Sequence, residues 1–155
     1  MKALGAHVRI RDGRYLAGFA VVEGDRLLLQ QSYPAPADET DAGRLGELYG
    51  RVGDLITRAA PDLFAFKVSE IARQSASAVI AHRAEGVVLA AVGRHRSLDV
   101  SLWSGPKLWK PAGFTGPTKT KELVEVLCAR LTQQPETDEA RQAAAAAIAA
   151  LGATV

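Results

Sequence analysis

The sequence predicts an α/β domain in which a mixed five-stranded sheet carries helices on both faces. The first third of the chain has the pattern of three consecutive strands joined by tight turns. After residue 40, segments with helical spacing alternate with short apolar segments, the order expected when further strands are added to a sheet. A chain of 155 residues with 48% apolar and 23% charged residues is typical of a globular protein, so residues 1–155 are expected to form one domain.

Three strands open the chain, over Lys2–Arg11, Arg14–Glu23 and Arg26–Tyr33. The dipeptide Asp12-Gly13 separates the first two strands, and it is a strong hairpin signal because both residue types tolerate positive φ. Gly24-Asp25 supplies a second turn before the third strand. The three strands are therefore expected to form an antiparallel meander.

The rest of the chain alternates helices and strands. The expected helices are Asp41–Ala60, Ser75–Val92, Glu122–Leu131 and Asp138–Leu151, and the expected strands are "LFAFKV" (63–68) and "LDVSLW" (98–103). The first of these strands is nearly all apolar, as strands buried on both faces of a sheet are. The first helix has glycines at positions 43, 46, 50 and 53, opposite its apolar face. These glycines indicate either the close approach of another element or a tolerated solvent face.

Charge and cysteine content indicate the cellular compartment of the protein more clearly than its binding partner. The formal net charge is only +2, but between Gly86 and Lys121 the only acid is Asp99, so this stretch can attract phosphate. The single Cys128 cannot form a disulfide within the chain and lies in an apolar helical pattern, which fits a buried thiol in a reducing compartment. The sequence has no leader pattern and no uninterrupted apolar run that would span a bilayer, so we expect a cytoplasmic protein without membrane contact.

Six segments, in their order and spacing, resemble the RuvC family of Holliday-junction resolvases. They are "LGAH" (4–7), "GFAVV" (18–22), "PDLFAFKVSE" (61–70), "SASAVIAHRAEGVVLAAV" (75–92), "GFTGPTK" (113–119) and "TDEARQAAAAAIAA" (137–150). The similarity runs from Leu4 to Leu151. It implies an RNase H-like fold, in which three antiparallel strands are followed by parallel additions to the same sheet.

The resemblance also implies a site at the strand ends, where four carboxylates of the family hold two divalent ions. Two hard dications repel each other, and several anionic oxygens are needed to hold them. At the corresponding positions this chain carries His7, Lys67, Asp138 and Arg141, so one carboxylate remains. We therefore expect no metal, no cofactor and no enzyme activity, with His7 marking a lost metal site. If Asp138 points into the cleft, it is expected to pair with Lys67 or His7, joined by Arg141 from the same helix face. The alternative is that Lys67 extends to solvent and Asp138 only caps the last helix.

Three functions remain open. The first is a non-catalytic protein that still binds branched or duplex DNA through basic side chains. The candidates are Arg9, Arg11, Arg14, Lys107, Lys110, Lys119 and Lys121. Trp103 and Trp109 interleave with these lysines, and they either stack on a base or pack in the core. The second function is a scaffold without DNA contact, and the third is an active nuclease with carboxylates rearranged among Asp12, Glu70 and Glu139.

A symmetric homodimer is a further implication of the resemblance. Ala76, Ala78 and Ala81 lie at the start of the central helix, and such small residues would let two copies approach closely. The pathway and the identity of any protein partner are not encoded in these patterns.

Overall fold

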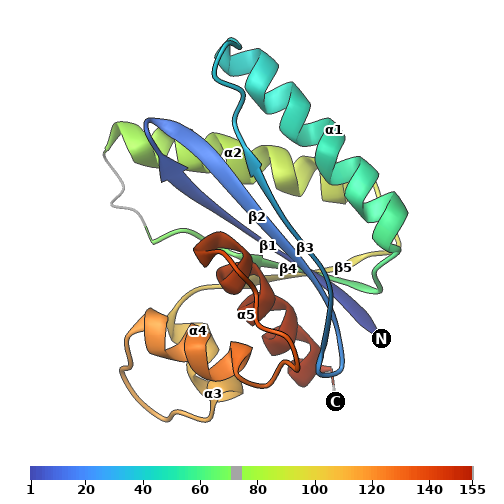
Figure 1. Ribbon diagram of the computed structural model, residues 1–155, viewed down its shortest axis with the longest axis vertical. Coiled ribbons are helices and arrows are strands. Elements are labelled where there is room, and N and C mark those ends of the chain that lie inside the picture. The colour runs from blue at the N-terminus through green and yellow to red at the C-terminus, as the bar shows by residue number, and fades with distance from the viewer. Residues whose placement is uncertain (71–74, 155) are drawn as a thin grey trace.

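The computed structural model describes residues 1–70 and 75–154, and it contains the expected five-stranded mixed sheet (Figure 1). The strands are β1 (Lys2–Arg11), β2 (Arg14–Glu23), β3 (Arg26–Pro34), β4 (Leu63–Lys67) and β5 (Asp99–Trp103). Their order across the sheet is β3-β2-β1-β4-β5, with β1, β2 and β3 antiparallel and β4 and β5 added parallel to β1. The predicted meander and the parallel additions are confirmed.

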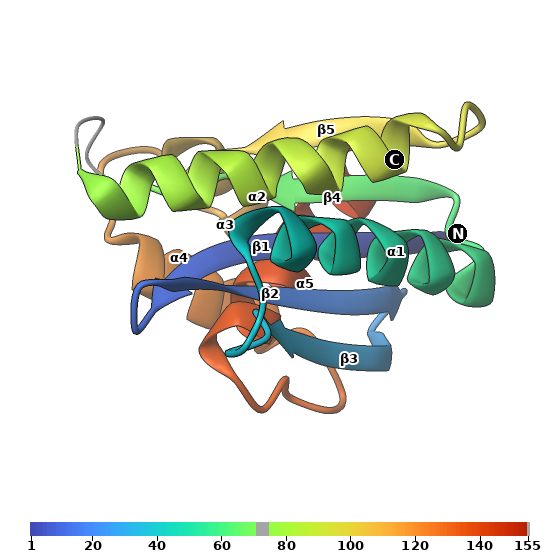
Figure 2. The same cartoon turned by 90° about the horizontal axis from the view of Figure 1, so that it is seen from above.

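Helices cover both faces of this sheet, as predicted. One face carries α1 (Asp41–Ala59) and α2 (Ala76–Gly93), and the other carries α3 (Trp109–Ala112), α4 (Thr120–Cys128) and α5 (Asp138–Ala153). Figures 1 and 2 show the two layers separated by the strands. The stretch expected to be a loop after β5 also contains a short 3₁₀ helix, Pro106–Leu108. Each face has its own apolar core, so the sheet is buried from both sides.

Helix α5 lies against the sheet with backbone contact at two glycines. A Cβ atom on Gly5 would overlap the carbonyl oxygen of Ala143, and one on Gly18 would overlap the backbone of Glu139. Thr137 caps the helix, because its side chain accepts a hydrogen bond from the backbone N–H of Ala140. These contacts fix the N-terminus of α5 over the middle of β1 and β2, beside the pair of His7 and Gly18.

The glycine face of α1 is a solvent face within this chain. A Cβ atom on Gly46, Gly50 or Gly53 would have no heavy atom within 4 Å in the described structure. The first of the series, Gly43, lies beside the side chain of Glu39 instead. The close-approach interpretation of this stripe therefore finds no support in the monomer.

Helix α2 bears on two expectations. Its 18 residues are long and apolar enough to cross a membrane by length and composition alone, although Arg83 and Glu85 interrupt its apolar run. In this fold the helix packs on the sheet and on α1, and 33% of its residues are buried. Ala78 and Ala81 belong to the buried part and are 0% exposed, so they cannot meet a second copy, whereas Ala76 is exposed.

Candidate nucleic-acid cleft

His7 and Lys67 lie side by side where β4 ends, next to the middle of the longer strand β1. They are register partners in the parallel pairing of these strands, and both are buried. The ring nitrogen Nδ1 of His7 lies 2.8 Å from the carbonyl oxygen of Lys67. Because a carbonyl only accepts, Nδ1 carries the proton and Nε2 is left unprotonated. Burial, and then the charge of Lys67, lower the pKa of His7 to about 4, so the imidazole is neutral at pH 7.

Lys67 is a buried cation held by the segment that follows it. Its side chain is 2% exposed, and Nζ donates to the carbonyl of Val68 at 3.1 Å and to Glu70 Oε1 at 3.2 Å. Strand β4 ends at Lys67, so the alternation that would have turned Glu70 to the opposite face does not extend to it. Glu70 therefore reaches back to the ammonium group.

Glu70 also ties two later segments to this point. Its carboxylate accepts from the backbone N–H of Gly105 at 2.8 Å and from Thr120 Oγ1 at 3.1 Å. Burial alone would raise the pKa of Glu70, but the charge of Lys67 and these hydrogen bonds outweigh it and hold the pKa below its ordinary value. The carboxylate is thus ionised at neutral pH and engaged in the framework of the site.

A cleft of about 410 Å³ opens beside His7, at the N-terminus of α5. It is lined by His7, Arg9, Lys121, Asp138, Glu139 and Gln142. Glu139 is 5% exposed and accepts a hydrogen bond from Ser32 Oγ at 2.6 Å. Burial raises the pKa of Glu139, but the hydrogen bonds from Ser32 and from the helix start lower it further than burial raises it. Arg9 Nη1 lies 3.9 Å from Glu139 Oε2 and 3.4 Å from Asp138 Oδ2.

The expected pairing of Asp138 with an internal cation is wrong. In the described part of the chain Asp138 pairs with Arg9, not with His7, Lys67 or Arg141, and its side chain is 78% exposed. Arg141 donates from Nε to the carbonyl of Pro135 at 3.1 Å and is not among the residues that line the cleft. A one-residue step along a helix rotates a side chain by about 100°, so the buried acid of this helix is the next residue, Glu139.

Gln142 lies one turn after Glu139 and faces the same cleft. Its Oε1 atom is buried and has no hydrogen-bond partner within residues 1–70 and 75–154. The buried side chains that line the cleft are therefore His7, Glu139 and Gln142, and the buried Lys67 lies beside His7 without lining it. Sequence patterns could not separate this set from the one shifted by one residue, because positions 138 and 139 are both acids.

These residues do not fit a centre of two divalent ions. Among the residues that the structure describes, no three His, Cys, Asp or Glu side chains gather as metal ligands. The one buried carboxylate of the cleft, Glu139, already binds Ser32 and faces Arg9, and a permanent cation stands at Lys67. Hard divalent cations need several oxygen ligands, and this set does not provide them.

The predicted basic residues divide between different surfaces. Arg9 and Lys121 line the cleft, and the exposed Lys119 immediately precedes α4, two residues from Lys121. Lys107 and Lys110 line a separate cavity beside the C-terminal end of α5. Only the first three of these cations therefore belong to the cleft region.

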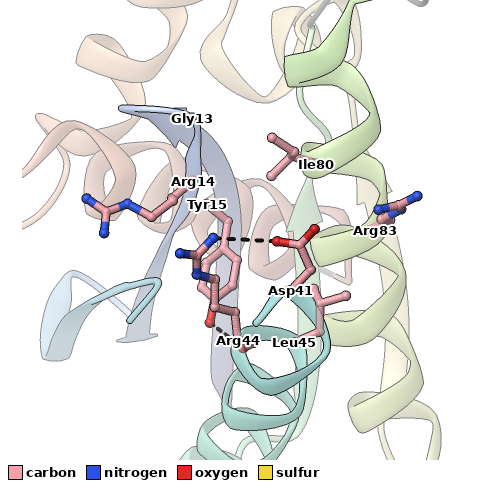
Figure 3. A pocket seen from close by; sticks show the side chains of 8 residues that line it. All are labelled: Gly13, Arg14, Tyr15, Asp41, Arg44, Leu45, Ile80 and Arg83. Carbon is pink, nitrogen blue, oxygen red and sulfur yellow. Dashed lines mark hydrogen bonds and ion pairs between the residues drawn. The ribbon is translucent and has the colours of Figure 1, made fainter. Parts of the chain in front are cut away.

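The basic hairpin lies beyond the cleft, at the tip joining β1 to β2. Arg11 is exposed there, and Arg14 borders a pocket of about 60 Å³ between the hairpin, α1 and α2. Within that pocket Arg44 pairs with Asp41 at 3.5 Å. Figure 3 shows the side chains of Arg14 and Arg83 directed away from each other on opposite sides of it, so these arginines do not converge on one ligand.

Comparison with known proteins finds a similar curated sequence and solved structures with the same fold. No family model matches the chain. It is 27% identical over 146 residues to a crossover junction endodeoxyribonuclease RuvC of Moorella thermoacetica, covering 90% of this chain and 86% of the relative. A Thermus thermophilus RuvC solved in complex with a Holliday junction substrate has a TM-score of 0.80 at 21% identity, over 99% of this chain and 95% of its own.

Two other solved structures share this architecture. T. thermophilus RuvC on its own superposes with a TM-score of 0.79 at 22% identity, covering 99% of this chain and 96% of its own. The yeast mitochondrial Holliday junction resolvase has a TM-score of 0.59 at 10% identity, covering 97% and 76%. At these identities the solved structures show the fold.

The expectation that the chain is not an enzyme is wrong. The finding that overturns it is the curated relative, which matches 90% of this chain and is named a crossover junction endodeoxyribonuclease. The resemblance drawn from six segments is thereby confirmed in its family and in its RNase H-like fold. On sequence match and fold together, this chain is similar to the RuvC family along most of its length and has the fold of the solved RuvC structures.

Proposed function

We propose that this protein binds four-way DNA junctions through the cleft at the N-terminus of α5. The observation that carries the proposal is the placement of Arg9 and Lys121 in one cleft at the strand ends. Arg9 is partly neutralised by Asp138 and Glu139, whereas Lys121 forms no ion pair within the described residues. Two helices, α4 and α5, also begin at this place, and helix N-termini favour anions such as phosphate.

The fold adds support from a relative. A RuvC with the same fold over 99% of this chain was solved with a Holliday junction substrate. Phosphodiester backbone is the ligand that a groove of Arg and Lys side chains with helix N-termini suits best. The scaffold alternative without DNA contact lacks an observation of this kind.

Binding is tested with a four-way junction and a linear duplex of the same sequence across a salt series. We expect preference for the junction, and a steep loss of affinity with salt because phosphate contacts release counterions. Arg9→Gln and Lys121→Gln should each lower the slope of log K against log salt by about 1. Arg26→Gln is the matched control, since Arg26 is exposed at the opposite end of the sheet. Equal, weak binding of both DNAs by wild type and variants would reject the proposal.

Strand cleavage can be followed on the same junctions with Mg²⁺ or Mn²⁺ in the buffer. We expect any product to depend on the buried Glu139 rather than on the exposed Asp138. Glu139→Gln should then remove the product, and Asp138→Asn should retain it. The reverse pattern would show that the exposed Asp138, and not the buried Glu139, is the carboxylate on which cleavage depends.

The protein is further proposed to act as a homodimer through the outer face of α2. This face carries small exposed residues in one stripe, Ala76, Gly86, Ala90 and Gly93, together with Val79, which is 47% exposed. Helix α2 is largely apolar, yet only 33% of its residues are buried in the monomer, and this stripe is left uncovered. A four-way junction presents equivalent strands in pairs, which a two-fold dimer with two clefts would match.

Light scattering at micromolar concentration tests the dimer. Val79→Glu and Ala90→Glu place a charge in the stripe and should give monomers that remain folded. Thr57→Glu, on the exposed face of α1, is the control that should leave the dimer intact. A wild-type mass equal to that of one chain would contradict this part of the proposal.

A further inference from the structure

We propose that the cavity between α3 and the C-terminal half of α5 binds a nucleoside phosphate. The cavity measures about 610 Å³ and is lined by Trp103, Lys107, Lys110, Arg130, Ile148 and neighbouring small residues at the end of α5. Small-molecule sites typically measure about 300–1,000 Å³, so a nucleotide fits in size. This inference goes beyond the proposed function, because the cavity is separate from the junction cleft.

The two sites lie at opposite ends of α5. The cleft is lined by Gln142, and this cavity by Gly152. Ile148 also lines the cavity, so six to ten residues of α-helix separate the two linings, which corresponds to about 9–15 Å along the axis. A nucleotide in the cavity would therefore not touch the groups that line the cleft.

The cavity carries three positive charges without a compensating acid among its described lining residues. Lys107 Nζ donates to the carbonyl of Leu102 at 3.3 Å, and Arg130 Nη2 donates to the carbonyl of Pro111 at 2.6 Å. Carbonyl contacts position these side chains, but they do not neutralise them. Neither these two cations nor Lys110 forms an ion pair with any residue that the structure describes. Three such cations around one cavity attract an anion.

Trp103 gives the cavity an aromatic wall. The indole Nε1 donates to Ser101 Oγ at 2.9 Å, so the polar edge of the ring is already satisfied. What the ring can still offer is its apolar surface, on which a base can stack. An aromatic wall beside Lys and Arg side chains is the combination that recognises a base and a phosphate together. The ligand can be a free mononucleotide or a nucleotide of an unpaired DNA strand, since both have this chemistry.

Tryptophan fluorescence provides the test. The chain has two tryptophans, so Trp109→Phe leaves Trp103 as the only reporter. Deoxyadenosine 5′-monophosphate should quench it saturably, whereas deoxyadenosine or inorganic phosphate alone should bind more weakly because each lacks half of the ligand. Lys110→Gln and Arg130→Gln should each weaken the nucleotide by at least about tenfold. Arg26→Gln, with the same loss of charge elsewhere, should leave the affinity unchanged.

Calorimetry with Trp103 variants isolates the stacking contribution. Trp103→Phe keeps an aromatic face and should retain binding, and Trp103→Leu should lose most of it. Tighter binding of a short deoxyadenosine oligonucleotide than of the mononucleotide identifies a DNA strand as the source, and equal affinity identifies the free nucleotide. Lys121→Gln should weaken the junction without changing nucleotide quenching, which separates failure of this site from failure of the cleft.

Two outcomes would overturn the inference. One is no quenching by the nucleotide up to millimolar concentration. The other is that Lys110→Gln and Arg130→Gln lower the melting temperature but leave quenching unchanged, because the cations would then only stabilise the C-terminal carbonyls of α5.

Discussion

Glu70→Gln should destabilise the fold more than Lys67→Met, although both changes remove the same ion pair. The Lys67 side chain is 2% exposed and that of Glu70 is 49% exposed. Replacing Glu70 leaves a buried ammonium group whose only other acceptor among the described residues is the carbonyl of Val68. Breaking a fully buried pair costs about 3–5 kcal/mol and an exposed one about 0–1 kcal/mol, so we expect about 2 kcal/mol for this half-exposed pair.

Lys67→Met should remain within about 1 kcal/mol of wild type. Methionine fills a similar volume, and the carboxylate of Glu70 keeps Gly105 and Thr120 as donors. In a chain of this size about 2 kcal/mol corresponds to about 4–8 °C in melting temperature, which calorimetry resolves. The double variant should recover most of the stability lost in Glu70→Gln, because no buried charge remains.

The pH dependence gives a second measure of the same pair. The pKa of Glu70 is lowered in the folded state, so its contribution is complete above the unfolded value of 4.5 and is lost as pH falls through the folded value. The gap between wild type and Glu70→Gln should thus narrow in acid. A Glu70→Gln variant as stable as wild type at pH 7, or a Lys67→Met variant as unstable as Glu70→Gln, would refute the reasoning.

Three other changes test features outside this pair. Gly5→Ala should lower the free energy of unfolding by more than about 2 kcal/mol, because its methyl group would overlap the backbone of Ala143. Gly50→Ala, in open space on α1, should raise the same free energy by about 0.5–1 kcal/mol. Both are measured by urea titration, and equal effects would contradict the close contact at Gly5. Trp109→Phe removes a buried N–H that has no partner in the described structure, so the melting temperature should stay the same or rise, and a clear fall would indicate an unrecognised acceptor. His7 has a folded pKa of about 4 against 6.5, so the unfolded chain binds more protons between these values and stability should fall by about 2 kcal/mol from pH 7 to pH 5. His7→Gln should reduce that fall, and an unchanged pH profile would show that the imidazole is not buried neutral.

Most of the fold could be predicted because local patterns and tertiary structure agree. The Asp12-Gly13 turn has positive φ at both residues, as the hairpin required, and the segments of helical spacing became α1, α2 and α5. The stretch after β5 was missed as a helical region, because its Gly, Pro and Lys residues favour loops locally and its short helices depend on contacts with the rest of the chain. Local propensity was outweighed there by packing.

The site was predicted less well, since its residues come from segments far apart in the chain. That His7 and Lys67 are neighbours could be predicted from their positions on two strands of the same sheet. The pairing of Lys67 with Glu70 depended on where β4 stops, and the choice of Glu139 over Asp138 depended on one step of helical rotation. Residue types alone determine neither the residue at which β4 ends nor which of the two adjacent acids of α5 faces the sheet.

The backbone contacts at Gly5 and Gly18 separate the frame of the cleft from its chemistry. At these glycines the backbone of α5 meets that of β1 and β2, and the contacts of Arg9 with Asp138 and of Ser32 with Glu139 add to the attachment of the helix. Exchange of one cleft side chain for another polar residue would therefore remove one such contact but leave the close backbone approach in place. The groups that line the cleft can thus change while its frame is kept, whereas any larger residue at Gly5 or Gly18 would displace α5 from the sheet.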